Sequence, residues 1–227
     1  MSGIRALTFD LFGTVLDLAG SLTPAIEPWL RERQSNVAAA AFWAQWRARQ
    51  RIEQYQDTIM MLGHSGYLRT ARRALVYVSR LHGVDASDES IDELMKSWWQ
   101  LSPFPEVTDA LEKMSGRYQL VALSNGNADF LRHLVDNRIR WPFADVISVD
   151  VMGAFKPHPA VYRRAAQMIG VRPHECMMIS ANSFDVAGAK ACGYSGAFVN
   201  RLQLPFEDSP YQPDVEVGDF TELAEAI

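Results

Sequence analysis

Four short apolar segments, each followed by small polar residues, constrain the fold of this chain most strongly. The first, residues 4–9, ends at Asp10, and the others are residues 119–123, 176–179 and 196–199. Apolar residues at helical spacing fill the segments between them, residues 107–114, 129–136, 161–169 and 185–192. This alternation predicts an α/β fold with a doubly wound, parallel, Rossmann-like core, whose carboxyl-edge loops form a site.

Residues 18–100 interrupt the alternation, because they carry long helical patterns and no convincing strand. The patterns cover residues 37–61, 67–81 and 87–99. A stretch of this length is long for one connection. We therefore expect residues 1–17 and 101–227 to form a catalytic core and residues 18–100 an inserted helical cap subdomain. The alternative is a set of crossover helices on one continuous domain. Residues 205–217 are expected to form an irregular surface segment before a short final helix.

Composition excludes several classes of function. With 22 Lys and Arg against 27 Asp and Glu, the net charge is −5, which argues against a nucleic-acid partner. The longest apolar run, residues 37–44, is far too short to cross a membrane. Cys176 and Cys192 build no disulfide framework, so a cytoplasmic location is expected. The five histidines lack metal-ligand spacing; we interpret them as surface or loop residues and expect no metal or cofactor.

Asp10 directly follows the first apolar segment, a position that suits a nucleophile. Its carboxylate would lie at the sheet edge among free backbone N–H groups, although a lone Asp there more often caps the following turn. A nearby cation would keep such a carboxylate ionised and oriented. The polar groups expected to meet Asp10 at this edge are Ser124-Asn125, Lys156 after residues 151–155, and Ser180 with Asn182 and Asp185.

These segments resemble the four motifs of the haloacid dehalogenase superfamily. The matching residues are Phe9-Asp10-Leu11-Phe12-Gly13-Thr14, Ser124-Asn125-Gly126, Lys156-Pro157 with Tyr162, and residues 180–185. The chain further resembles the L-2-haloacid dehalogenases (type II). That closer resemblance lies in Trp46-Arg47, residues 101–107 and Asn200-Arg201.

The resemblance implies a small-molecule 2-haloacid as substrate and no cofactor. Asp10 would displace halide from a short (S)-2-haloalkanoic acid, and water would hydrolyse the resulting aspartyl ester to a 2-hydroxy acid. The residues that would position the nucleophile and the water are Thr14, Lys156, Ser180, Asn182 and Asp185. The residues that would contact the substrate are Leu11, Phe12, Ser124, Asn125, Tyr162 and Phe184. Relatives of this fold often dimerise, so a homodimer is expected.

Arg47 would receive the departing halide. The pattern leaves open whether Arg49 or Arg51 does so instead, because a helix arginine is commonly paired at the surface, here with Glu53 or an aspartate. Several positions also depart from the dehalogenase pattern and leave the preferred halide and chain length open. They are Phe12 for a tyrosine, Phe184 for a tryptophan, Ala181 for a serine and Ala48 for a polar residue.

Two other functions remain open. A phosphatase or phosphonatase of the same superfamily would need a second acid where Phe12 stands. It would also need acidic Mg²⁺ ligands in the fourth motif, where Ser180-Ala181-Asn182 stand. The residues therefore disfavour phosphoryl chemistry. The remaining alternative is a catalytically weak relative that acts as a binding module, with Asp10 retained for structure.

Overall fold

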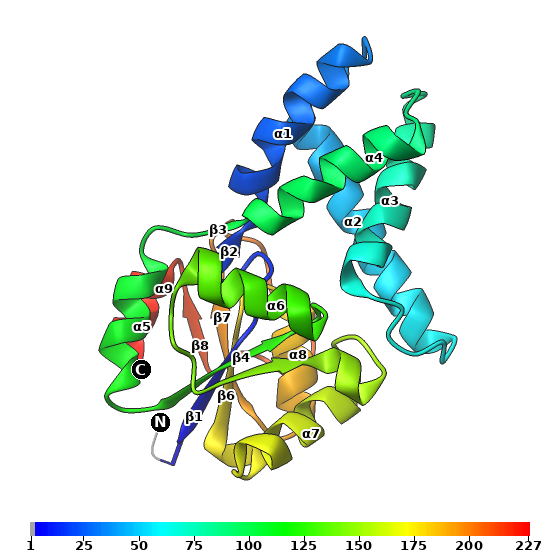
Figure 1. Ribbon diagram of the computed structural model, residues 1–227. Helices are drawn as coiled ribbons and strands as arrows, with labels where there is room; N and C mark the ends of the chain where they lie inside the picture. The colour runs from blue at the N-terminus through cyan, green and yellow to red at the C-terminus, as the bar shows by residue number, and fades with distance from the viewer. Residues whose placement is uncertain (1–2) are drawn as a thin grey trace.

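The computed structural model describes residues 3–227 and is built around one parallel sheet (Figure 1). Its strand order is β5-β4-β1-β6-β7-β8, and every neighbouring pair is parallel. The strands are β1 (Ala6–Phe9), β4 (Gln119–Ser124), β5 (Asp145–Ser148), β6 (Cys176–Ser180), β7 (Ser195–Val199) and β8 (Val215–Val217). The predicted doubly wound, parallel α/β fold is therefore confirmed.

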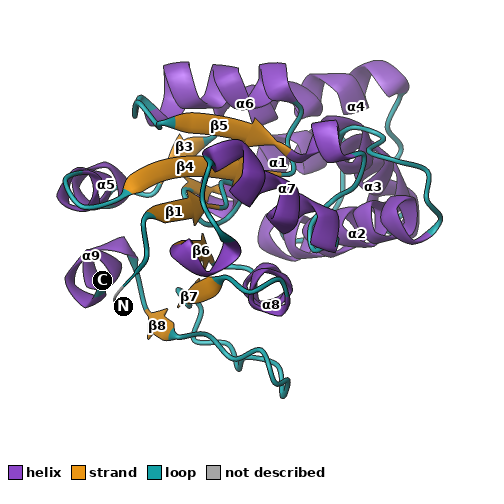
Figure 2. Cartoon of the chain, turned by 90° about the horizontal axis from the view of Figure 1, so that it is seen from below, coloured by secondary structure: helices purple, strands orange, loops and turns teal. Residues whose placement is uncertain are grey.

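Helices cover both faces of this sheet (Figure 2). They are α5 (Val107–Ser115), α6 (Ala128–Leu134), α7 (Pro159–Ile169), α8 (Ser183–Ala191) and α9 (Phe220–Ala226). Leu7 and Phe9 pack into one apolar cluster, whereas Ala6 packs into a second cluster with Val161 of α7. Because successive side chains point to opposite faces, a strand buried on both faces is mostly apolar, as β1 is; its one polar side chain, Thr8, donates to the Met177 carbonyl at 3.2 Å.

The segment between β1 and β4 holds the helices α1 (Leu18–Glu32), α2 (Ala39–Ile59), α3 (Tyr67–Leu81) and α4 (Asp88–Met95). A 3₁₀ turn, Lys96–Gln100, follows α4. We call residues 18–100 the helical insert. Two short antiparallel strands, β2 (Leu16–Asp17) and β3 (Ser102–Pro103), pair where the chain leaves the core and returns. In Figure 1 the insert stands beyond the end of the sheet near β2 and β3. A division into two domains at residues 17 and 100 stays a prediction.

Aromatic side chains hold the insert together. Trp46 and Trp98 are fully buried, and their rings meet edge to face at 5.8 Å. The Trp46 indole N–H also donates to the Ala71 carbonyl on α3 at 2.7 Å. Burial of such large rings contributes most of the stability of a small helical layer, so Trp46 serves the insert rather than the catalytic site.

Three segments differ from the sequence predictions. Residues 151–155 form no strand: the strand is β5, residues 145–148, and a 3₁₀ turn (Val149–Met152) and a loop lead from it to Lys156. The segment 205–217 is not wholly irregular, because β8 extends the sheet through pairs such as Val199 with Val217. The helix α1 lies in the expected helical insert but outside the three predicted helical patterns, and it contains Pro24 and Pro28. Within the described residues, no helix is long and apolar enough to span a membrane.

Candidate active site

Three neighbouring strands bring the predicted polar residues to one edge of the sheet. Asp10 follows β1, Ser124 ends β4 and Ser180 ends β6. Phe9 lies opposite Ala122 on one side and Ile179 on the other, so these strands end at similar depths. The Asp10 amide extends the β1–β6 pairing by donating to the Ile179 carbonyl at 3.0 Å. The carboxyl edge therefore gathers the polar residues of three loops.

The Asp10 carboxylate is 5% exposed and is held on one side by two donors. Its Oδ2 accepts from Thr14 Oγ1 at 2.8 Å and from Asn182 Nδ2 at 2.9 Å. Among the described residues, its Oδ1 meets a single donor, Lys156 Nζ, at 3.4 Å. Thr14 Oγ1 is itself fixed by the Ala181 amide at 2.8 Å. The carboxylate is thus oriented through Oδ2, while Oδ1 is the less engaged oxygen.

Lys156 lies between two buried carboxylates. It is 1% exposed, and its Nζ is 2.9 Å from Asp185 Oδ2 as well as 3.4 Å from Asp10. Tyr162 donates to Asp185 Oδ1 at 2.8 Å. Burial raises the pKa of Asp185 above the usual range, an effect that the positive charge of Lys156 opposes. Buried charges are tolerated when they are paired and hydrogen-bonded, as these three are.

Two residues expected to contact substrate have other surroundings. Tyr162 is fully buried, and its hydroxyl bonds to Asp185, so it supports the buried charges. Phe184 is half-buried and meets the ring of Tyr55 on α2 edge to face at 5.8 Å. Ser180 was expected to position Asp10. Its hydroxyl instead accepts from the backbone N–H of Asn182 at 3.1 Å. It reaches the nucleophile through Asn182.

Unused hydrogen-bond donors surround Asp10. The hydroxyl of Ser124 is buried and bonds to no described residue. Within residues 3–227, the backbone N–H groups of Leu11, Phe12 and Asn125 donate to no protein atom. Free N–H groups at a turn form a binding site for an anion. A substrate carboxylate would satisfy these donors.

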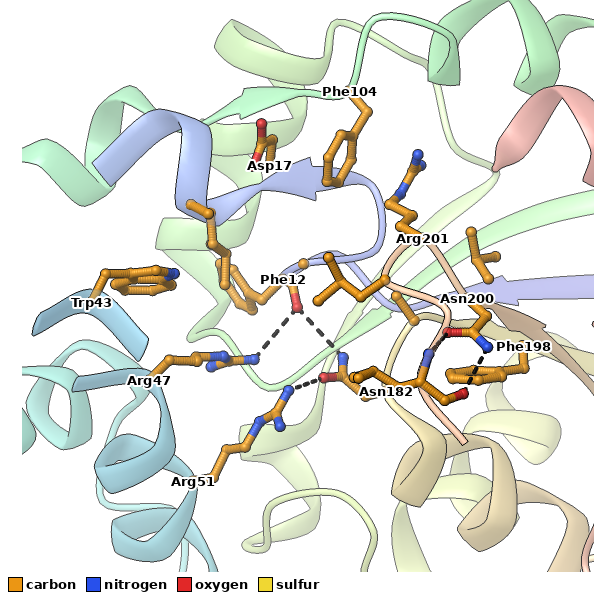
Figure 3. Close-up of a pocket in the computed structure, with 17 residues that line it drawn as sticks. Phe12, Asp17, Trp43, Arg47, Arg51, Phe104, Asn182, Phe198, Asn200 and Arg201 are labelled. Carbon is orange, nitrogen blue, oxygen red and sulfur yellow. Dashed lines mark hydrogen bonds between the residues drawn. The ribbon is translucent and has the colours of Figure 1, made fainter. Parts of the chain in front are cut away.

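The helix α2 presents two arginines to the sheet edge (Figure 3). Arg47 Nη2 lies 3.4 Å from the Phe12 carbonyl oxygen, and Arg51 Nη2 donates to Asn182 Oδ1 at 2.5 Å. Arg49 instead pairs with Glu53, at 2.9 Å through its Nε. The structure therefore places both Arg47 and Arg51 beside the loops at the sheet edge, and directs Arg49 away from them. Their four-residue spacing puts both on one helix face, the signal that could have identified the pair.

A cavity of about 270 Å³ lies between the core and the insert. Its lining includes Phe12, Trp43, Arg47, Arg51, Phe104, Asn182 and Arg201. Asp10 does not line this cavity, but Phe12 and Asn182 do, and Asn182 is bonded to Asp10. The cavity therefore adjoins Asp10 through Asn182. Arg201 at its rim is paired with Glu106 at 2.6 Å, and its guanidinium stacks over the Phe104 ring at 3.7 Å.

Further contacts join the insert to the core at Asn125. Its Nδ2 donates to Gln54 Oε1 of α2 at 3.2 Å, while its Oδ1 accepts from the Lys156 amide at 2.9 Å. His64 lies 2.9 Å from the Asn125 carbonyl through Nε2, with its ring 4.0 Å from that of Phe155. The interpretation of every histidine as a surface or loop residue is thus incomplete: His64 lies in a loop but is half-buried against the core. Burial lowers its pKa.

The donor set at the sheet edge differs from that of a metal centre. The Lys156 ammonium lies between the carboxylates of Asp10 and Asp185, where it supplies the positive charge. Among residues 3–227, no group of three or more His, Cys, Asp or Glu side chains is arranged to hold a metal ion.

Comparisons with known proteins agree with this geometry. A family model described as haloacid dehalogenase-like hydrolase matches residues 4–193. The haloacetate dehalogenase H-2 of Moraxella sp. (strain B) is 30% identical over 219 residues, covering 96% of this chain and 95% of that protein. The (S)-2-haloacid dehalogenase of Xanthobacter autotrophicus is 32% identical over 200 residues, which cover 88% of this chain and 76% of that protein.

A solved structure adds a view of chemistry at such a site. The L-2-haloacid dehalogenase from Xanthobacter autotrophicus with chloropropionic acid covalently bound matches with a TM-score of 0.85 at 26% identity. The match covers 98% of this chain and 97% of that one. Sequence and fold agree over nearly the whole length: the chain belongs to the haloacid dehalogenase-like hydrolases, among relatives named (S)-2-haloacid dehalogenases.

Proposed function

We propose that this chain hydrolyses short (S)-2-haloalkanoic acids to 2-hydroxy acids. The observation that carries the proposal is the Asp10 carboxylate, oriented by Thr14 and Asn182 through one oxygen and adjoining the two arginines of α2. A carboxylate attacks carbon most effectively when it is held in place and partly desolvated. Covalent attachment of chloropropionic acid to a relative supports the same chemistry here.

In the first step, the Asp10 carboxylate forms a bond to C2 of the substrate as the carbon–halogen bond breaks. The bonding pair leaves with the halide, and the configuration at C2 inverts. Ser124 and the free N–H groups of Leu11, Phe12 and Asn125 hold the substrate carboxylate. Arg47 stabilises the negative charge that grows on the halogen, a contribution that is largest in the transition state.

In the second step, water attacks the ester carbonyl carbon of Asp10. The bond between that carbon and the ester oxygen breaks, so the 2-hydroxy acid leaves with an oxygen that came from Asp10. The carboxylate regains one oxygen from water. Of the two protons of that water, one ends on the departing oxygen of the hydroxy acid, and the other passes to the Lys156–Asp185 pair and then to solvent. Burial raises the pKa of Asp185, which makes its carboxylate a better acceptor for that proton.

The insert has a separate role in this proposal. Residues 18–100 act as the cap that covers the sheet edge and supplies Arg47 to the reacting halogen. Arg47 bonds to the carbonyl of Phe12 and to the hydroxyl of Tyr67, both of which are neutral. Its charge is therefore free to meet the halide.

A single-turnover reaction in ¹⁸O-labelled water tests the proposal. With enzyme in excess over 2-chloropropionate, the first hydroxy acid should stay largely unlabelled, because its new oxygen comes from Asp10. Asp10→Asn should abolish turnover, since an amide lacks the charge for displacement, while circular dichroism and the melting temperature report an intact fold. Full labelling of the first product would contradict an ester intermediate. Phosphate release from p-nitrophenyl phosphate with no halide release would favour the phosphatase alternative.

A further inference from the structure

Arg51 is a half-buried cation without an anionic partner in the part of the chain that the structure describes. It bonds to one group, the amide oxygen of Asn182, and its Nε is buried with no hydrogen-bond partner. Burial, followed by the positive charge of Arg47, lowers the pKa of Arg51 to about 10. A guanidinium still carries its proton at neutral pH with such a value. The cavity therefore holds a charge that no described residue neutralises directly.

Arg47 also bonds to neutral oxygens alone, but three other arginines of this region have carboxylate partners. Arg49 pairs with Glu53, and Arg73 pairs with both Glu53 and Asp57. Arg201, at the rim of the cavity, pairs with Glu106.

Among the described residues that line the cavity, Asp17 carries the one carboxylate. Asp17 accepts from the Gly20 amide at 2.8 Å and points away from Arg51 in Figure 3. Because an unpaired buried charge is costly, an arginine left unpaired beside a cavity indicates an anionic ligand.

The position of Arg51 relative to the nucleophile limits where that ligand lies. One amide group, the side chain of Asn182, separates the Arg51 guanidinium from Asp10 Oδ2. A substrate whose C2 touches Asp10 would bring a group on C3 or C4 close to Arg51. The cavity volume of about 270 Å³ approaches the lower end, about 300 Å³, of sites that hold much larger ligands. It has room for more than a halogenated acetate or propionate.

We propose that Arg51 binds a second carboxylate of the substrate, and that the preferred substrates are therefore 2-haloalkanedioic acids. The inference rests on the proposed dehalogenase function and names its substrate class. The first carboxylate occupies the donors around Ser124, Arg47 receives the halide, and the second carboxylate satisfies the free Nε of Arg51. The reaction is otherwise unchanged: the carbon–halogen bond breaks, and a 2-hydroxyalkanedioic acid forms.

Kinetics with two substrates test this assignment. For the wild type, Arg51→Leu and Arg51→Lys, kcat/KM would be measured with 2-chloropropionate and with 2-chlorobutanedioate at pH 8, where both carboxylates are ionised. In Arg51→Leu the ratio of kcat/KM for the dianion to that for the monoanion should fall by about 10–100-fold, the effect of one charged hydrogen bond. Arg51→Lys should restore part of the ratio. Arg49→Leu, on the same helix but paired with Glu53, should leave it unchanged.

An equal loss for both substrates in Arg51→Leu would overturn the assignment, since it would mean that Arg51 acts only by positioning Asn182. A wild-type enzyme that dehalogenates 2-chloropropionate but not 2-chlorobutanedioate would overturn the inference and leave the proposed function standing. Turnover of neither compound would overturn the proposed function itself.

Binding of an unreactive ligand gives a readout independent of turnover. By titration calorimetry, butanedioate should bind the wild type at least about tenfold more tightly than butanoate, because only the dianion can pair with Arg51. Arg51→Leu should lose that preference, and Arg49→Leu should keep it. Equal affinity of the two acids for the wild type would contradict a second carboxylate site whatever the activity.

Discussion

The sheet edge carries buried charges and the facing side of α2 carries half-buried ones, but only the charges of the sheet edge are paired with one another. There Lys156 pairs with Asp10 and Asp185. On α2, Arg47 and Arg51 bond to neutral oxygens alone. A paired set of charges fixes its geometry before any ligand arrives. Unpaired charges gain most when an anion binds. In the proposed function, the core therefore orients Asp10 before substrate binds, and the arginines of the insert are free to bind the substrate and the halide.

The largest effect is expected from breaking the paired set. Lys156→Met would leave the Asp10 and Asp185 carboxylates buried together without a cation. We expect a loss of about 3–5 kcal/mol in the free energy of unfolding, together with the loss of nearly all halide release. Chemical denaturation and a halide electrode would measure the two. Lys190→Met is a matched control, because Lys190 pairs with Asp214 nearer the surface; it should cost at most about 1 kcal/mol. Similar losses in both variants would remove the distinction drawn here.

The next effect comes from the unpaired side. Arg47→Ala should lower kcat for halide release by roughly 10²–10³-fold, the effect of removing one donor from a developing charge, with little change in the melting temperature. Arg49→Ala serves as control, because its guanidinium faces Glu53. If Arg49→Ala lost more activity than Arg47→Ala, the halide would have to lie on another face of α2.

A smaller effect should appear with pH at the contact between the two regions. Burial lowers the pKa of His64 below 6.5, its usual value. Below about pH 6.5 the unfolded chain therefore takes up a proton that the folded chain refuses, and stability falls as the pH falls. The free energy of unfolding, measured with urea between pH 8 and pH 5, should drop less steeply for His64→Gln than for the wild type. His174→Gln, at an exposed turn, is the control and should keep the wild-type dependence of stability on pH. If His64→Gln also kept that dependence, the titration of His64 would not be the cause of the loss of stability at low pH.

Excess EDTA should have the smallest effect, namely none. Lys156 supplies the cation between Asp10 and Asp185, and displacement at carbon creates no phosphoryl charge for a metal to neutralise. Halide release would be compared with and without EDTA and with added Mg²⁺. Loss of activity with EDTA and recovery with Mg²⁺ would mean that Lys156 alone does not supply the positive charge that the site needs.

Much of the core could be predicted from sequence, because its strands are apolar on both faces and end in polar residues. Residues 4–9 show this pattern, and β1 occupies Ala6–Phe9. The pattern fails for β8, where Val215–Val217 is short, carries a glutamate and follows a proline-rich segment. It also fails for Lys156, since a loop rather than a strand delivers this residue to the edge. Short edge strands and loop paths depend on tertiary contacts, which local sequence patterns do not encode.

The candidate site could be predicted in its residues more than in their contacts. Asp10, Thr14, Asn182 and Lys156 do meet, because the order of parallel strands brings their loops together. The insert was harder. Helical spacing puts residues 47, 50, 51 and 54 on one face of α2, but it cannot say that this face meets the core. Only the packing of α2 against the sheet edge shows that Arg51, and not Arg49, reaches the core.

Asn125 connects the helix α2 of the insert to the backbone of Lys156 in the core. Its side chain is shared: the amide nitrogen holds α2 through Gln54, and the amide oxygen holds the backbone of Lys156. Any movement that lifts α2 to admit substrate breaks the first bond and loosens a residue that fixes the second. In the proposed reaction, Lys156 is therefore held most firmly while α2 lies against the core, where solvent is excluded.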